Sequence, residues 1–294
     1  MSFLVPKKPQ ILYAPMLATF GGGSARGFNP GGGASGPGAV GSAVNALDIL
    51  GDGSCRSCLN MESGSDLNGS NTVTQGGGFS TATKKWGSQS IYIPDGNTTT
   101  YISSNGIDLS SGPVDGDYTI SVWFYLTALR TGGIQPPMMM NSGSDTDANG
   151  AITVASPNTG GVSSDRMFGK GRSTATSIDA GYDSGTLIAA GSWKHGLHVL
   201  DTTANTYKQY LNGSLIKTTT SASTTGAQPP SLSNAGGNSS NVDYLLGHEP
   251  DAFNPYGGFD GSQCIIGYID QARIFNRVLN ATEVGYVYNE QLIP

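Results

Sequence analysis

The segment DTDANG, residues 145–150, carries side-chain oxygens at alternate positions. The oxygens of Asp145, Asp147 and Asn149 would converge if the backbone turned, and Gly150 permits such a turn. Carboxylate and amide oxygens are the ligands that calcium prefers. The twelfth position, where an EF-hand loop has its bidentate Glu, holds Ser156. The segment therefore predicts either a calcium site of another kind or an ordinary Asp/Asn turn without metal.

A second segment, DAFNPYGGFDG, places Phe253, Tyr256 and Phe259 in one loop rich in Gly and Pro. Aromatic side chains in such a loop can stack on sugar rings, contact a protein partner, or fold back over the hydrophobic core. All three interpretations stay open. We expect any carbohydrate or partner contact to use these residues.

Charge and hydropathy exclude several classes of partner. Charged residues make up 12% of the chain, the formal net charge is −6, and the only Lys or Arg pairs are Lys7-Lys8 and Lys84-Lys85. A groove that follows a phosphate backbone needs more positive charge than this, so we expect no nucleic-acid partner. No window approaches the roughly 18 apolar residues of a membrane span, so we expect no membrane partner.

The pattern of apolar residues predicts a β-sandwich that ends in one short helix. Strand signals recur over residues 88–93, 118–126, 193–200, 207–216 and 265–275, and Asn212-Gly213 is a strong hairpin signal. A capping box formed by Asn280 and Glu283 precedes the helix. We expect Trp123 and Trp193 to be buried core residues.

The last strand contains two charges whose positions can be predicted from its alternation. In a regular strand Asp270 and Arg273 lie on opposite faces, so each is expected to hold a separate loop or strand in place. The same alternation directs Ile269 and Phe275 inward.

Four segments in order resemble the laminin-G-like, concanavalin A-like lectin family. They are residues 59–93, YTISVWFYL at 118–126, residues 192–216 with a W-x-H strand and a Y-x-N-G hairpin, and GYIDQARIFNRVL at 267–279 with its helix. The resemblance covers about residues 46–292. It implies a jelly-roll sandwich of two antiparallel sheets and a structural role for His195. Because this family often binds calcium in rim loops, it also supports the calcium interpretation of residues 145–150, but an ordinary Asp/Asn turn remains the preferred interpretation.

Some relatives of this fold are glycanases that use a Glu-x-Asp-x-x-Glu strand. None of the four glutamates has that spacing; they are Glu62, Glu249, Glu283 and Glu290. His195 and His198 lie three apart in a predicted strand and point to opposite faces, so they cannot share a metal. We therefore expect that the protein is not an enzyme and that calcium is its only candidate cofactor.

The chain divides into an extended Gly/Pro-rich arm, residues 1–45, and the sandwich domain, residues 46–294. Ten of the 22 residues from 21 to 42 are Gly, so this stretch has few side chains to bury. The apolar residues ahead of it are expected to pack against other subunits; they are Ile11, Leu12, Tyr13, Met16, Leu17 and Phe20. We expect a homo-oligomer, with a trimer as one arrangement.

The Gly-rich opening resembles that of environmental phage fibre and decoration proteins. The first residues, MSFLVPKKPQ, lack the charged and apolar regions of a secretion signal. These features favour a viral structural protein of a phage virion, made in the host cytoplasm, whose lectin-like domain is displayed or binds host surface polysaccharide. The alternative is a free carbohydrate-binding module of a secreted bacterial protein.

Overall fold

The computed structural model divides the chain into two units, residues 1–32 and 33–294, and all of the described residues lie in the second unit. They are residues 48–67, 72–75, 78–97, 99–100, 102–109, 112–113, 117–131, 134–141, 150–155, 166–171, 180–204, 206–220, 241–250 and 259–291. The predicted arm, residues 1–45, lies outside them, so its role stays a prediction.

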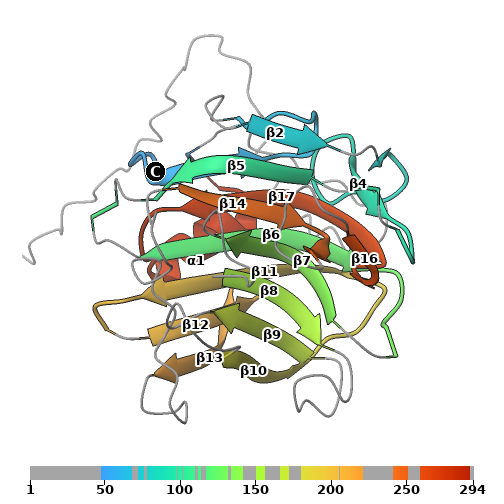
Figure 1. Ribbon diagram of the computed structural model, residues 1–294. Helices are drawn as coiled ribbons and strands as arrows, with labels where there is room; N and C mark the ends of the chain where they lie inside the picture. Colours follow the sequence, from blue (N-terminus) through green and yellow to red (C-terminus); the bar gives the residue numbers. More distant parts are fainter. Residues whose placement is uncertain are drawn as a thin grey trace, which may run out of the picture. The chain divides into compact units, whose positions relative to one another are not determined.

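The described residues form two large antiparallel sheets, one small strand pair and one helix, which confirms the predicted sandwich (Figure 1). The first sheet runs in the order β13 (Ser214–Thr220), β12 (Thr206–Leu211), β11 (Trp193–Asp201), β6 (Tyr118–Leu126), β17 (Gly267–Phe275), β4 (Ser90–Ile93) and β3 (Phe79–Ser80), with β1 (Cys55–Leu59) also paired to β17. The second runs β10 (Ala180–Leu187), β9 (Arg166–Gly171), β8 (Gly150–Ala155), β7 (Ile134–Asn141), β14 (Asn241–Leu246), β5 (Ile102–Asp108) and β2 (Thr72–Gln75). A small third pair joins β15 (His248–Pro250) to β16 (Phe259–Cys264).

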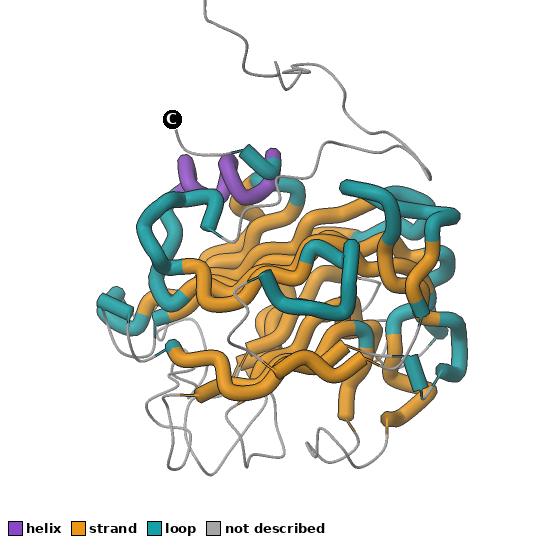
Figure 2. The backbone as a smooth tube through the Cα atoms, turned by 90° about the horizontal axis from the view of Figure 1, so that it is seen from above, coloured by secondary structure: helices purple, strands orange, loops and turns teal. Residues whose placement is uncertain are grey.

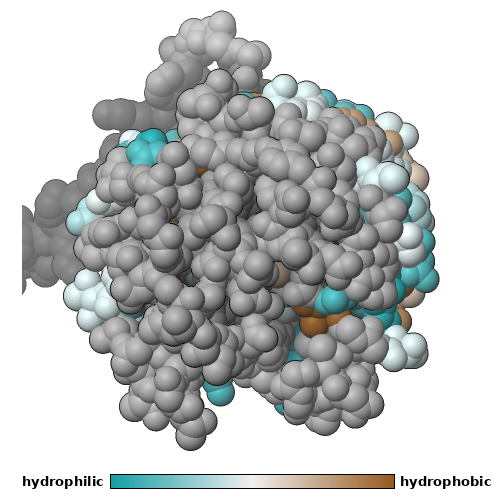
Figure 3. All heavy atoms as spheres, viewed as in Figure 1, coloured by the Kyte–Doolittle hydropathy of each residue, from teal (hydrophilic) through white to brown (hydrophobic). Residues whose placement is uncertain are grey.

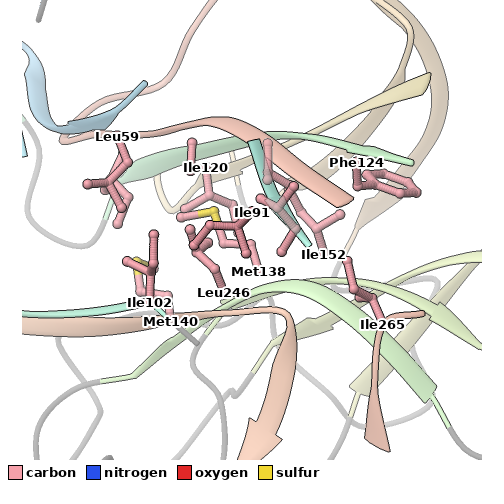
Figure 4. Close-up of a cluster of buried hydrophobic side chains, with 14 of the residues drawn as sticks. Leu59, Ile91, Ile102, Ile120, Phe124, Met138, Met140, Ile152, Leu246 and Ile265 are labelled. Carbon is pink, nitrogen blue, oxygen red and sulfur yellow. The ribbon is translucent and has the colours of Figure 1, made fainter. Parts of the chain in front are cut away.

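The main core fills the space between the two sheets (Figure 4). Ile120 and Phe124 of β6 contribute from the first sheet, and Met138 and Met140 of β7 contribute from the second. Strand alternation explains why these side chains all point into the core, because residues two apart along a strand share a face. At the margin of Figure 3, where described residues are visible, most are white to teal, which marks intermediate to hydrophilic residues. The large exposed apolar side chains of the described part are Leu67, Leu187 and Leu215.

The helix α1 (Ala281–Asn289) covers part of the outer face of the first sheet, and Figure 2 shows it beside the strand layers. Val284 and Val287 pack there with residues of β11, β12 and β17, namely Leu197, Val199, Tyr210 and Phe275. The predicted capping box is confirmed, since Asn280 accepts from the backbone of Glu283 and the Glu283 carboxylate accepts from the Asn280 N–H. The hairpin at Asn212-Gly213 is confirmed as well, with positive φ angles at both residues.

One glycine allows two core side chains to meet. A Cβ added to Gly169 on β9 would lie 2.5 Å from the ring of Tyr207. The Tyr207 hydroxyl lies 2.6 Å from Nδ1 of His198, deep between the sheets. His195 faces the opposite side of β11, where its Nε2 lies 2.8 Å from the Ser121 hydroxyl. The prediction that the two histidines cannot share a metal is therefore confirmed.

A β-bulge in β17 corrects the prediction made for the closing strand. The pairing of β17 with β6 shifts between Asp270 and Ala272, and the intervening Gln271 has φ of 42°. Asp270 then pairs with Trp123 and Arg273 with Ser121, two positions on the same face of β6. Asp270 and Arg273 thus share the outer face, because the bulge inserts one extra residue and resets the alternation.

The same shift changes the position of Phe275. Ile269, ahead of the bulge, lies in the core between the sheets as predicted. Phe275, beyond the bulge, packs under the helix instead of pointing between the sheets. The prediction that Phe275 points inward was wrong, because the extra residue in the bulge resets the alternation for Phe275 as it does for Arg273.

Each of the two charges holds a separate element on this face: Asp270 holds a loop, as expected, whereas Arg273 holds the end of a helix and not a loop or strand. Oδ2 of Asp270 accepts from the backbone N–H groups of Lys85, at 2.9 Å, and Trp86, at 3.0 Å. The Arg273 guanidinium forms an ion pair with Glu290 at the C-terminal end of the helix, at 2.6 Å from Nη2 to Oε2. Both side chains of this pair are only 1% exposed. The loop before β4 and the end of the helix are therefore fixed to one strand.

The three cysteines are buried and form no disulfide. Burial raises the pKa of Cys58 to about 11, although the nearby Arg273 lowers it.

Within the described part of the chain, no group of three His, Cys, Asp or Glu side chains could hold a metal ion. No described helix has the length and apolar character needed to cross a membrane.

Replacing Glu290 by Gln should destabilise the protein by about 3–5 kcal/mol, because it leaves the buried Arg273 guanidinium without a countercharge. Urea unfolding measures the change. As a control, Asp108→Asn alters a pair with Arg56 whose side chains are 38% and 30% exposed, and should cost at most about 1 kcal/mol. Equal losses for the two variants would contradict the role assigned to Glu290.

Candidate functional site

Most of the predicted site residues lie outside the described part of the chain. Asp145, Asp147 and Asn149 fall in the undescribed stretch before β8, and Phe253 and Tyr256 fall between β15 and β16. Phe259 begins β16, where it pairs with Pro250 of β15. The predicted calcium site and the predicted aromatic loop contact therefore stay predictions.

The structure reveals a different set of aromatic side chains, aligned across four neighbouring strands. Tyr92 of β4, Tyr268 of β17, Tyr125 of β6 and Trp193 of β11 are consecutive cross-strand partners. Successive ring centroids lie 4.8, 6.0 and 5.8 Å apart. We call these four residues the aromatic row.

The row lies on the outer face of the first sheet, away from the second. The residues on either side of Tyr92, Ile91 and Ile93, belong to the core between the sheets, so Tyr92 must point outward. Tyr125 points outward for the same reason, because its neighbours Phe124 and Leu126 belong to the core between the sheets. Four strands at about 4.8 Å spacing give the row a length of roughly 14 Å.

Access to the row differs along its length. Tyr125 and Trp193 are 8% and 7% exposed, whereas Tyr92 and Tyr268 are half-buried. Each tyrosine combines an apolar ring with a hydroxyl that can donate and accept a hydrogen bond. A ligand ring would therefore first meet the end of the row formed by Tyr92 and Tyr268.

A second aromatic group, the Trp123 cluster, adjoins the row and consists of Trp86, Trp123, His195 and Tyr288. Trp123 stacks on Tyr288 of the helix, with ring centroids 5.3 Å apart, and contacts Trp86 edge-on at 6.0 Å. His195 is its cross-strand neighbour, at 5.0 Å. The prediction that Trp123 and Trp193 are buried is confirmed, but both lie on the outer face and not between the sheets.

Lys85 brings a positive charge to this cluster. Its ammonium lies 4.4 Å from the ring centroid of Trp123 and 5.1 Å from that of Trp86. Burial lowers the pKa of Lys85, and the Asp270 carboxylate opposes this effect. Burial raises the pKa of Asp270 well above its usual value, although the N–H groups of Trp86 and Lys85 act in the opposite direction.

His195 is neutral at ordinary pH. Burial, together with the positive charges of Arg273 and Lys85, lowers its pKa to about 3. Among the described residues, the buried indole N–H groups of Trp86, Trp123 and Trp193 have no hydrogen-bond partner. The chemistry available at this face is thus ring stacking, hydrogen bonding through tyrosine hydroxyls, and attraction of an anion by Lys85.

Sequence reasoning missed the aromatic row. Alternation within YTISVWFYL, residues 118–126, places Trp123 and Tyr125 on one face, and that signal was available. The alignment with Tyr92, Tyr268 and Trp193 depends on strand register, which local pattern does not determine.

Comparison with known proteins places this fold in a family. The family model described as the concanavalin A-like lectin/glucanases superfamily, Laminin_G_3, matches residues 95–285, which is more than half of the chain. The chain belongs to this superfamily. Among curated proteins, no sequence matches it.

Solved structures show the same fold at low sequence identity. The binding domain of Paraclostridial Mosquitocidal Protein 1 is 15% identical, with a TM-score of 0.52, over 80% of this chain and 52% of that one. The receptor-binding domain of botulinum neurotoxin C/D mosaic serotype is 11% identical, with a TM-score of 0.52, over 81% and 51%. The botulinum neurotoxin serotype D ligand-binding domain, solved in complex with N-acetylneuraminic acid, is 12% identical, with a TM-score of 0.51, over 81% and 51%. This chain thus spans about half the length of these toxin domains.

Acidification should destabilise the protein in part through His195. Its pKa is about 3 in the folded protein against 6.5 for the unfolded chain, so between these values the unfolded chain binds more protons. The contribution of His195 to stability is complete above pH 6.5 and is lost as the pH falls toward 3. His195→Gln should reduce the slope of unfolding free energy against pH by up to about 1.4 kcal/mol per pH unit.

Urea denaturation across this acidic range measures the slope, and Tyr92→Ala serves as a control that leaves all histidines in place. An unchanged slope in the His195 variant would show that this histidine titrates normally in the folded protein.

Proposed function

We propose that the sandwich is a carbohydrate-binding domain and that the aromatic row forms its sugar-contacting surface. The observation that carries this proposal is the alignment of Tyr92, Tyr268, Tyr125 and Trp193 across four strands. Pyranose rings present an apolar C–H face that packs on aromatic rings, while their hydroxyls bond to polar groups such as tyrosine hydroxyls. A row of several rings suits a glycan of several sugars better than a single sugar.

Family membership supports this choice of ligand, because the superfamily contains lectins and glucanases. The botulinum serotype D domain, which shares the fold, was solved with a bound sugar. We propose a binding role without catalysis. Calcium held by Asp145, Asp147 and Asn149, and glycan contacts by Phe253, Tyr256 and Phe259, belong to the same proposal.

For the whole chain, we propose a structural protein of a phage virion, of the fibre or capsid-decoration type, that displays this domain. The support is the composition of residues 1–45, in which an apolar, proline-containing stretch precedes a Gly-rich stretch. The prolines restrict the backbone and reduce the entropy lost when the segment docks on a partner. Partners would be copies of the chain, other virion proteins and host surface polysaccharide. A free carbohydrate-binding module is the alternative.

Removing single rings from the accessible end of the row should weaken glycan binding. Tyr268→Ala and Tyr92→Ala each lose a stacking contact of about 0.5–1.5 kcal/mol, which corresponds to roughly 2–12-fold in Kd. A glycan array identifies the ligand, and calorimetry on the best ligand gives Kd. Leu215→Ala, an exposed apolar residue on β13, is the matched control and should bind as wild type does. If no glycan on the array binds, the carbohydrate-binding proposal is wrong.

Deleting residues 2–42 should leave the sandwich folded and soluble but unable to join a particle. Ordering the backbone costs roughly 1–2 kcal/mol per residue, and the Gly-rich stretch offers few side chains to offset that cost unless other subunits contribute. Thermal unfolding tests the first part, and incorporation into virions, judged by electron microscopy and sedimentation, tests the second. A truncated protein that still incorporates would refute the assembly role, and a full-length protein that stays monomeric would favour the free module.

A further inference from the structure

Lys85 occupies an unusual place for a lysine, because its side chain lies against two indole rings. The residue is only 8% exposed. Its ammonium lies 4.4 Å from the Trp123 ring centroid, where attraction to the ring face compensates part of the lost hydration. Among the described residues, the backbone N–H of Lys85 donates to Asp270, and the ammonium makes no hydrogen bond or ion pair.

The loop that carries Lys85 is anchored at several points. Asp270 accepts from the N–H groups of Lys85 and Trp86. Glu62 accepts from the Ser88 N–H at 2.8 Å, and the Ser90 hydroxyl donates to the Thr83 carbonyl at 2.5 Å. The backbone that carries Lys85 is therefore held in place before any ligand arrives, and the Trp123 and Trp86 rings lie against its ammonium. This arrangement reduces the entropy that binding would cost.

The positive charge is incompletely compensated. Asp270 is the carboxylate that acts on Lys85, but its Oδ2 is already bonded to two backbone N–H groups. A partly buried cation gains most from a partner anion, because its hydration is already lost. The position therefore favours a ligand that brings a negative group.

This charge stands beside the aromatic row. Trp123 and Tyr125 are two residues apart on β6 and share the outer face, so their Cα atoms are roughly 7 Å apart. Tyr268 and Asp270 have the same relation on β17, and Asp270 binds the Lys85 backbone. Lys85 is thus next to the middle of the row, where an acidic substituent on a stacked sugar would come.

We propose that Lys85 binds a carboxylate or sulfate group of a glycan whose rings stack on the aromatic row, so that the ligand class is an acidic polysaccharide. This inference rests on the proposed carbohydrate-binding function. The chain has a formal net charge of −6, so long-range attraction does not bring a polyanion to it. Selectivity for acidic glycans then comes from this local contact.

The test uses matched pairs of oligosaccharides with the full-length protein. One arm compares uronic-acid oligosaccharides with the same compounds after reduction of the carboxyl groups, and the other compares sulfated oligosaccharides with their unsulfated forms. We expect wild type to bind the acidic member of a pair about tenfold more tightly, and the arm that shows this preference identifies the anionic group. Salt should weaken binding only modestly, since one ionic contact is involved.

Three variants connect the preference to Lys85. Lys85→Gln should lose the roughly tenfold preference while retaining affinity for the neutral member, and Lys85→Arg should keep the preference. Lys84→Gln, which removes the neighbouring half-buried lysine whose ammonium donates to the Thr81 carbonyl, should behave as wild type. Thermal unfolding confirms that each variant is folded.

The outcomes separate this inference from the function on which it rests. Binding of neutral glycans that depends on Tyr268 but shows no preference for acidic members would overturn the role of Lys85 and leave the carbohydrate-binding proposal standing. A preference that survives in Lys85→Gln would also overturn it. Failure of every pair to bind would overturn the carbohydrate-binding function itself.

Discussion

One extra residue in β17 makes the buried ion pair between Arg273 and Glu290 possible. The same residue determines which side chains of β17 lie on the outer face of the first sheet. Gln271 forms the bulge that brings Arg273 to the face covered by the helix. Its side chain also donates to the Asn60 carbonyl at 3.3 Å. A buried ion pair contributes less net stability than its Coulomb energy suggests, because both ions lose their hydration. Its larger effect here is to specify a single register for β17 and a single position for the end of the helix.

Asp270, on the other side of the bulge, extends this arrangement to the proposed ligand-binding face. By accepting from Lys85 and Trp86 it fixes the loop over the Trp123 cluster. Tyr288 reaches the same cluster from the helix whose end is held by Arg273. The bulge therefore positions both the aromatic surroundings of Lys85 and the strand that carries Tyr268. Structural and proposed binding residues are interleaved along β17.

Local patterns predicted the elements of this fold well. The run at residues 118–126, the Asn212-Gly213 turn and the Asn280–Glu283 cap each encode their structure within a few residues, through alternation, positive φ angles and side-chain capping. The bulge at Gln271 had no such signal, because a positive φ usually points to Gly or Asn and a Gln occupies the position. It forms because contacts from distant parts of the chain hold the residues on both sides of it.

The candidate site was harder to predict for a related reason. The aromatic row joins strands from separate parts of the sequence, and its alignment follows from register, which is a property of the assembled sheet. Trp123 and Trp193 were recognised as buried, but alternation alone cannot say which side of a doubly covered sheet a large side chain occupies. The loop residues predicted from composition, Asp145 to Asn149 and Phe253 to Tyr256, fall outside the described residues.

The three buried thiols have a consequence for where this fold can exist. Cys55, Cys58 and Cys264 form no disulfide, and burial raises the pKa of both Cys55 and Cys58. Little of the thiolate form of Cys55 and Cys58 is therefore present at neutral pH, and the thiolate is the form that reacts with oxidants and disulfides. The sandwich is held together by packing, hydrogen bonds and ion pairs, none of which responds to redox potential. The fold of the described residues is therefore held without a disulfide, so its contacts do not change with the redox potential of the surroundings.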